Sequence, residues 1–262
     1  MRIGFVGVGR MGAPMVGRLA AMGQTVRVHA RSDRARAGIE ASGDVLTVDT
    51  AAATAVNADA VVVCVHDDEQ VRQVCHDGGL LTAMLPGSVL IVHTTGHPRT
   101  VRDMAEVLAQ RGVSIVDAPV SGGPEDIVDG RITTFVGGSD DAVAAARTVL
   151  DHYSNPSFHT GVLGTGQLTK LVNNAVFASN TAVLGAAIGI GRGLGIEEEV
   201  LLQCLQRGSA SSMVLDTVRG TGGFENFDRA VGEFVTKDIA VVRRVATELD
   251  VELGLLDSTL TR

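Results

Sequence analysis

Two side chains four residues apart, Lys170 and Asn174, have the types and the spacing to act on a small molecule. Four residues is about one turn of a helix, so an ammonium and an amide would project from the same face. A lysine in such a place can take up and release a proton, and an amide can hold the molecule beside it. A surface lysine whose stem lies along the helix gives the same pattern, so the surrounding elements must separate the two interpretations.

The pair belongs to a stretch that predicts one long helix, over about residues 165–193. A Gly-x-Gly at its start allows a tight entry, and Gly193 and Gly195 suit a C-terminal stop. The residues between are mostly Leu, Val, Ala and Ile. Because this helix joins two differently built halves, we expect two domains, residues 1–162 and residues 163–262.

The first half opens with MRIGFVGVGRMG, an apolar strand that runs directly into Gly7-x-Gly9-x-x-Gly12 and then into an amphipathic helix. Gly7 permits the tight turn, Gly9 lets a pyrophosphate approach the backbone, and Gly12 lets helix and strand pack closely. The phosphates would lie at the helix N-terminus, beside Arg10 and Met11. The alternative is a turn that binds nothing. A glycine triplet alone is weak evidence for a dinucleotide site, but one placed between a strand and a helix is strong evidence.

The second strand, TVRVHA from Thr25, ends where a protein selective for NAD offers an acidic residue to the ribose hydroxyls. Arg31 and Ser32 stand there instead. A guanidinium can hold a 2′-phosphate by charge-assisted hydrogen bonds, which predicts that NADPH is preferred over NADH. Asp33 follows directly, and a solvated loop arginine is the alternative interpretation.

Runs of β-branched residues then alternate with helical segments, which predicts a Rossmann-type, doubly wound, mostly parallel sheet with helices on both faces. In such sheets ligands bind outside the carboxyl ends of the strands. Val65 closes one strand, and HTTGHP, which contains Thr95, closes the next, so both should face the cofactor. His66 and His97 are acids or bases by type, although a lone loop histidine is more often solvated. The expected strands after the second are residues 45–48, 60–65, 88–93, 113–116, 132–138 and 158–160.

The segment DAPVSGG, residues 117–123, follows one of these strands. Such a loop exposes backbone N–H groups beside the Ser121 hydroxyl, and with Gly122 it forms a cradle for a carboxylate. We therefore expect a small substrate that carries a carboxylate. A turn of no function is the alternative.

Beyond the long helix, the sequence has helical spacing with apolar faces and no alternation typical of strands. The expected helices lie within residues 196–208, 211–220 and 235–251. We therefore expect an all-helical second domain. With several apolar faces, it would complete its core against another copy of the chain, as a homodimer or homotetramer.

Composition restricts the class of protein. The chain of 262 residues is 45% hydrophobic and 20% charged, which is enough for a proper core, and its net charge of -8 disfavours a nucleic-acid surface. Three scattered cysteines form neither a disulfide framework nor a metal site. The chain starts in a strand, which leaves no room for a signal peptide, and its longest apolar run is too short to span a membrane. We expect a cytoplasmic protein whose partners are small molecules.

Taken together, six motifs resemble the β-hydroxyacid dehydrogenase family, which includes 3-hydroxyisobutyrate dehydrogenase, tartronate semialdehyde reductase and glyoxylate/succinic semialdehyde reductases. The first half is likewise similar to the NAD-binding domain of 6-phosphogluconate dehydrogenase. The motifs are GFVGVGRMGAPM, ARS after the second strand, TTGHP, DAPVSGG, GTGQLTKLVNN and KD at residues 237–238. They occur in a sensible order and cover essentially the whole chain.

The resemblance implies a reaction and a site for it. The reaction is the NADP-dependent interconversion of a small β-hydroxy acid and its semialdehyde or keto form, between the two domains. A lysine of ordinary pKa, ~10.4, is a poor base at neutral pH, so burial should lower the pKa of the catalytic lysine. The implied residues are Gly7, Gly9 and Gly12 for the pyrophosphate, Arg31 for the 2′-phosphate, Thr95 near the nicotinamide, Ser121 and Gly122 for the substrate carboxylate, Lys170 as acid/base, Asn174 to fix the substrate, and Lys237 near the cofactor.

Two other functions stay open at this point: imine reduction, which related folds perform, and a non-catalytic NADP-binding role in regulation or assembly. Retention of Lys170 favours carbonyl chemistry. The sequence also departs from the family in two places. Asp126 and Ile127 stand where the family has a pair of small residues after SGG, which predicts a substrate-side loop of different shape and charge. The chain ends at Arg262, where many relatives continue with a helical segment.

Overall fold

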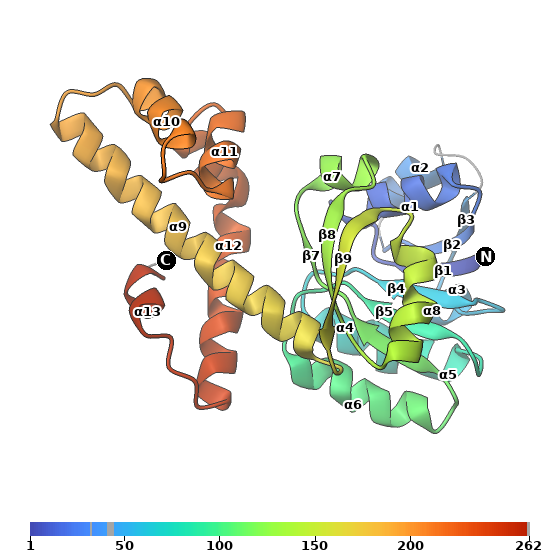
Figure 1. The fold of residues 1–262 in the computed structure, drawn as a ribbon. Helices are drawn as coiled ribbons and strands as arrows, with labels where there is room; N and C mark the ends of the chain where they lie inside the picture. The colour runs from blue at the N-terminus through green and yellow to red at the C-terminus, as the bar shows by residue number, and fades with distance from the viewer. Residues whose placement is uncertain (32, 41–44, 261–262) are drawn as a thin grey trace. The chain divides into compact units, whose positions relative to one another are not determined.

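The computed structural model describes residues 1–31, 33–40 and 45–260, and the chain divides into two compact units, Met1–Lys170 and Leu171–Arg262 (Figure 1). The strands of the first unit are β1 (Arg2–Val6), β2 (Thr25–His29), β3 (Val45–Val48), β4 (Ala60–Val63), β5 (Val89–Val92), β6 (Ser114–Asp117), β7 (Val120–Ser121), β8 (Ile132–Gly137) and β9 (Ser154–Gly161). Its helices are α1 (Gly12–Ala21), α2 (Asp33–Glu40), α3 (Ala51–Thr54), α4 (Asp68–Arg72), the π-helical turn η1 (Gln73–Asp77), α5 (Leu80–Ala83), α6 (Pro98–Ala109), α7 (Pro124–Val128) and α8 (Asp140–Leu150).

Within the described residues, these strands form one sheet in the order β3-β2-β1-β4-β5-β6-β8-β7, with β9 paired to β8. Strands β1 to β6 run parallel to one another, whereas β8 is antiparallel to β6 and β7. The strand order reverses at β1, as it does in dinucleotide-binding sheets. This arrangement confirms the Rossmann-type, doubly wound, mostly parallel sheet that the sequence predicts.

Alternate residues of the inner strands pack into two separate layers of the core. In β1, Phe5 belongs to one layer and Val6 to the other, and in β4 Val62 and Val63 divide in the same way. The first layer contains residues of α1, α2 and α8, and the second contains residues of α3 to α6. Figure 1 shows α1 and α2 on one side of the sheet and α5 and α6 on the other. Burial on both faces explains why these strands are continuous runs of Val, Ile and Ala.

The second unit is helical throughout its described residues. Helix α9 (Thr165–Gly193) runs into it from the first unit, and its other helices are α10 (Glu198–Arg207), α11 (Met213–Gly220), α12 (Phe224–Glu248) and α13 (Leu255–Thr259). Its core contains Leu184 and Ile188 of α9, packed with Leu202, Val218 and Phe227. The long helix has the bounds expected from the sequence, and the helical second half is confirmed.

Several short elements differ from the expected pattern. Part of DAPVSGG is a two-residue strand, β7, which pairs with β8. Strand β9 begins at Ser154, four residues earlier than expected, because it pairs along much of β8. Helix α12 begins at Phe224, after Gly223 with its φ of 122°. Strand β7 has two residues, which is too few to show a strand period, so the sequence pattern missed it.

One helix of the described chain, α9, is long and apolar enough to cross a membrane by length and composition alone. About 44% of its most apolar window is buried inside the protein. A helix in a protein's own core meets the same criterion, so length and apolar composition do not make α9 a membrane segment.

The three cysteines differ in exposure, with Cys75 buried and Cys64 partly buried against the core. Cys64 follows β4, and Cys75 lies in η1 within the second core layer. Burial raises the pKa of both thiols to about 12, so both stay protonated near neutral pH. Cys204, in α10, is exposed. Two of the three cysteines therefore act as core side chains.

Helix α9 starts on a buried carboxylate. Asp117, the last residue of β6, is fully buried, and its two oxygens accept hydrogen bonds of 2.6 Å from the backbone N–H groups of Gly164 and Gln167. A Cβ on Gly166 would lie 2.8 Å from the same carboxylate, so only glycine fits there. Burial raises the pKa of Asp117 to about 6 even though the two N–H donors act in the opposite direction. Asp117 is therefore mostly ionised at neutral pH.

Asp117→Asn should destabilise the first unit by about 1.5–3 kcal/mol, the range for a hydrogen bond to a charged group. The new NH2 group would face an N–H donor and leave it unpaired. Because the folded pKa is raised, the folded protein binds the proton more tightly, so the stability that Asp117 contributes falls as pH rises from about 4 to about 6.

Urea unfolding at several pH values measures both effects. The exposed Asp59, which accepts hydrogen bonds from Arg2, gives a matched control, and Asp59→Asn should cost less than about 1 kcal/mol. Equal losses for the two variants would contradict a special role for Asp117.

Candidate active site

The carboxyl ends of five neighbouring strands stand level in the sheet. Val6 of β1 pairs with His29 of β2 and Val63 of β4, Val63 pairs with Val92 of β5, and Val92 pairs with Asp117 of β6. The segments that follow these residues therefore leave the sheet side by side, at the edge where open α/β sheets bind ligands. This edge brings together the glycine turn, Arg31, Val65, Thr95 and the DAPVSGG segment.

The glycine turn after β1 is closely packed at two of its glycines and open at the third. Gly7 has a φ of 98°, and a Cβ there would meet the Cys64 carbonyl. A Cβ on Gly12 would meet the Gly7 carbonyl, whereas a Cβ on Gly9 would have no atom within 4 Å. Gly7 and Gly12 are therefore required by the turn, and the space at Gly9 leaves the backbone open to a phosphate group.

The start of α1 offers donors that the helix itself does not use. Met11 caps the helix without a side-chain hydrogen bond, and its first turn has no acidic residue. Arg10, beside Met11, is exposed. Backbone N–H groups of a first helical turn need partners, and the positive end of the helix dipole favours an anion there. These residues fit the pyrophosphate of a dinucleotide.

Arg31, after β2, is exposed, and its guanidinium is hydrogen-bonded to helix α4. Its Nη2 donates a hydrogen bond of 3.2 Å to Oε1 of Gln70 in α4. The same oxygen accepts from the His66 backbone N–H at 3.3 Å, and the Gln70 backbone N–H donates to Asp67 at 2.9 Å. A fixed guanidinium at this edge is suited to a phosphate. Ser32 lies outside the described residues.

The ends of β4 and β5 are tied together by one hydroxyl. Thr94 Oγ1 accepts from the Val65 N–H at 3.0 Å and lies 3.1 Å from the Val65 carbonyl oxygen. Thr94 is buried, and Thr95 after it is half-buried. The two residues expected beside the cofactor, Val65 and Thr95, therefore belong to one hydrogen-bonded pair of strand ends.

Two histidines at this edge have structural contacts. His93 is buried between the Ala118 carbonyl oxygen, 2.5 Å from Nδ1, and the Tyr153 hydroxyl, 2.8 Å from Nε2. Burial lowers the pKa of His93 to about 4, so it is neutral at pH 7. His97 caps α6 by accepting the Arg99 N–H at Nδ1. No local pattern in the sequence distinguishes His93 as a buried structural residue.

The segment expected to hold a carboxylate already contains one. Gly122 has a φ of 130°, and the N–H of Gly123 donates a hydrogen bond of 2.7 Å to the Asp126 carboxylate. Asp126 also pairs with Arg131. The donors that remain for an external carboxylate are the Ser121 hydroxyl and the Gly122 N–H. Asp126, which departs from the family pattern, thus occupies the Gly123 N–H, a donor that the segment would otherwise offer to a ligand.

Lys170 lies near the start of α9, one turn after a buried amide. Gln167 is 1% exposed, and its Oε1 accepts the Gly96 N–H at 2.9 Å while its Nε2 donates to the Thr94 carbonyl at 2.8 Å. Lys170 is half-buried. The turn that carries Lys170 is therefore bonded to the segment that carries Thr95. The sequence pattern missed this contact because it joins residues 71 and 73 positions apart.

The two remaining candidates meet in the helical unit. Asn174 is 9% exposed, and its Nδ2 donates a hydrogen bond of 2.8 Å to Oδ2 of Asp238. Lys237 Nζ lies 3.4 Å from Oδ1 of the same carboxylate. Lys170 and Lys237 are the only lysines among the 262 residues, against 20 arginines. A chain that otherwise uses arginine as its cation keeps a titratable amine at two positions, both in the motifs singled out above.

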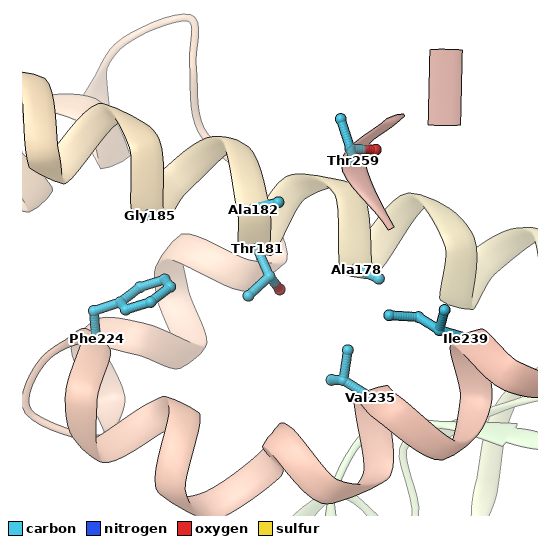
Figure 2. A pocket seen from close by; sticks show the side chains of 8 residues that line it. All are labelled: Ala178, Thr181, Ala182, Gly185, Phe224, Val235, Ile239 and Thr259. Atoms are coloured by element: carbon cyan, nitrogen blue, oxygen red, sulfur yellow. The ribbon is translucent and has the colours of Figure 1, made fainter. Parts of the chain in front are cut away.

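A cavity of about 230 Å³ lies elsewhere in the helical unit, between α9, α12 and α13 (Figure 2). Among the described residues that line it, the side-chain polar groups are the hydroxyls of Thr181 and Thr259. Figure 2 shows Phe224, Val235 and Ile239 along its other walls. Because the described lining offers no acidic or basic side chain, we place the candidate active site at the sheet edge instead.

Comparisons with known proteins identify a nucleotide-binding fold. Residues 2–164 match the NAD binding domain of 6-phosphogluconate dehydrogenase, and residues 164–260 match the family described as NAD-binding of NADP-dependent 3-hydroxyisobutyrate dehydrogenase. The NAD-dependent L-serine dehydrogenase of Pseudomonas aeruginosa is 31% identical over 217 residues, which are 82% of this chain and 72% of the relative. The 3-hydroxyisobutyrate dehydrogenase of the same organism is 31% identical over 215 residues, with the same coverage.

A solved structure shares the whole architecture. Mycobacterium tuberculosis 3-hydroxyisobutyrate dehydrogenase, solved with L-serine, matches 98% of this chain and 90% of its own with a TM-score of 0.85 at 26% identity. The two family matches together account for both halves of the sequence. The chain therefore belongs to the β-hydroxyacid dehydrogenase family and is an NAD(P)-dependent oxidoreductase that acts on CH–OH groups.

Proposed function

We propose that this enzyme interconverts a small β-hydroxy acid and its semialdehyde or keto form, with NADP as the cofactor and Lys170 as the general acid and base. The observation that carries the proposal is the bonding of the Lys170 turn, through Gln167, to the Thr94–Gly96 segment at the cofactor edge of the sheet. The helical turn proposed to carry the proton-transfer group is thereby hydrogen-bonded to the strand end proposed to border the cofactor.

The dinucleotide, when bound, supplies or accepts the hydride. Lys170 Nζ transfers the proton to or from the substrate oxygen. As a neutral amine it takes the hydroxyl proton during oxidation, and as an ammonium it gives the proton to the nascent alkoxide during reduction. Oxidation thus removes one hydride from carbon and one proton from oxygen, and reduction returns both.

We propose that the substrate carboxylate is bound by the Ser121 hydroxyl and the Gly122 N–H, and that Asn174 fixes the substrate. Lys237 is proposed to approach the cofactor, held by Asp238. Two donors at residues 121 and 122 are fewer than the segment would offer if the Gly123 N–H were not already bonded to Asp126. Substrates with a single small carboxylate fit this cradle best.

Ser121→Ala should raise KM for a hydroxy acid more than about tenfold, which corresponds to ~1.4 kcal/mol of lost binding. The effect should be small for a neutral alcohol of the same size, because it has no carboxylate to hold. Turnover of a panel of hydroxy acids and matched neutral alcohols, with NADP+, measures both. Equal turnover of the two classes by the wild-type enzyme would contradict the proposed substrate.

Arg31→Ala should weaken NADPH binding by about 1.5–3 kcal/mol, the range for a hydrogen bond to a charged group, and leave NADH binding nearly unchanged. Support comes from the exposed guanidinium and from Gln70, which holds it at the end of β2. Fluorescence titration with both cofactors gives the two dissociation constants. A wild-type preference for NADH would remove the basis of the assignment.

Lys170→Met should lower kcat by about 10²–10⁴-fold, the usual contribution of general acid–base catalysis, with NADPH affinity little changed. The variant keeps the apolar stem and removes the nitrogen. Oxidation by the wild-type enzyme should rise with pH and then level off as the amine loses its proton, and the variant should lack this limb.

Lys170→Arg is the matched control, because arginine keeps the positive charge but does not release a proton near neutral pH. It should be nearly as inactive as Lys170→Met. If arginine restores activity, Lys170 acts as a charge and not as an acid or base. A Lys170→Met enzyme that keeps more than about a tenth of the wild-type kcat would remove Lys170 from the mechanism.

A further inference from the structure

We propose that Gln167 is a positioning residue for the reaction: its side-chain amide fixes the separation between the Thr94–Gly96 segment and the helical turn that carries Lys170. The inference rests on the proposed function, in which hydride and proton leave neighbouring atoms of the substrate. It adds a residue to which neither the sequence motifs nor the comparisons give a role.

Both ends of the Gln167 amide are used. Oε1 accepts the Gly96 N–H at 2.9 Å, and Nε2 donates to the Thr94 carbonyl at 2.8 Å. At 1% exposure, the side chain has no water to replace either bond. An amide that donates on one side and accepts on the other fits this pair of backbone groups in a single orientation. The contact is therefore directional as well as close.

Gln167 and its partner Thr94 are each bonded to a strand end of the sheet. The Gln167 backbone N–H donates to Asp117 at 2.6 Å, which ties the helix to the end of β6. Thr94 is bonded through its hydroxyl to Val65, which ties the other partner to the end of β4. The amide thus closes a connection from β4 through β5 and α9 to β6. Lys170 lies three residues beyond it in the same helix.

The rate of the proposed reaction depends on the distance between the Thr94–Gly96 segment and the turn that carries Lys170. Hydride transfer needs the reacting atoms about 3–3.5 Å apart, and a displacement of about 1 Å can cost about 100-fold in rate. The segment with Thr95 borders the proposed nicotinamide site, and Lys170 must reach the oxygen on the same substrate carbon. A change in the Gln167 contact would move one group relative to the other without removing either.

The first test is Gln167→Leu, which keeps the volume and removes both hydrogen bonds. We expect kcat to fall about 10- to 100-fold, with the NADPH dissociation constant changed by less than about threefold, well short of the tenfold that ~1.4 kcal/mol would give. With substrate deuterated at the carbon that loses hydride, the isotope effect should depend more steeply on temperature than in the wild-type enzyme, because the transfer distance is no longer fixed.

The second test is Gln167→Glu, which keeps the shape and is useful if the leucine variant does not fold. An ionised glutamate can accept from Gly96 but repels the Thr94 carbonyl, whereas a protonated one can donate to it, and burial raises the pKa of a carboxyl group. The ratio of the variant's kcat to the wild-type kcat should therefore rise as pH falls from about 8 to about 6. The charged groups beside this contact are Asp68, whose carboxylate lies against Gly96, together with Asp117, Arg102 and Lys170. All four are present in both proteins, so the wild-type profile gives their titration without the new carboxylate.

Thr54→Val is the control for a purely structural effect. Thr54 is also fully buried in the first unit and donates a hydrogen bond of 2.6 Å to the Ala51 carbonyl, away from the sheet edge. It should lose stability without changing the isotope effect. If Gln167→Leu lowers only stability, or if Gln167→Glu shows no recovery at low pH, the inference is overturned. Failure of the proposed function would look different, because the wild-type enzyme would then be inactive on hydroxy acids or Lys170→Met would be active.

Discussion

The buried carboxylate of Asp117 is the interaction on which the candidate site depends. It ends β6, level with the ends of β1, β2, β4 and β5, and it receives the first N–H groups of α9. A charge without access to water is stable only when donors surround it, and here a helix N-terminus provides them. Glycines at 137 and 166 leave the room that this contact needs. Asp117 thus ties the sheet edge to the start of the helix that carries Lys170.

At the same edge of the sheet, the buried polar groups and the accessible ones have different roles. Gln167, Thr94 and His93 are buried, and their bonds go to backbone or to a neutral hydroxyl, so they hold segments in place. Arg31 is exposed, and Lys170 and Ser121 are partly so, as groups that meet a ligand must be. Of the three, Lys170 lies three residues from a buried group, Gln167, whose bonds to the Thr94–Gly96 segment hold the same turn of the helix. Catalytic geometry is then a property of the core as much as of the groups that react.

The sequence was sufficient for the inner strands and the long helix, and insufficient for several short elements, for some element boundaries and for most contacts between elements. Continuous runs of β-branched residues predict the inner strands, and the glycine spacing predicts the turn after β1, because both signals are local. The antiparallel course of β8 and the bond from Asp117 to Gly164, 47 residues later, depend on the assembled sheet and leave no local pattern. The contact of Asp126 with the Gly123 N–H is different: an acidic residue three positions after a helix N-cap is a known capping arrangement, and the pattern was present in the sequence.

The scarcity of lysine has a practical consequence for spectroscopy. Lys170 belongs to the first unit and Lys237 to the second, and the sequence holds no other lysine. Isotope labelling of lysine alone would give a side-chain spectrum with two signals, one from each unit. A single conservative replacement at Lys237 would assign both. The protonation of the Lys170 amine could then be followed directly through a titration of the chain with its own lysine in place. The second signal would report on the surroundings of Asp238.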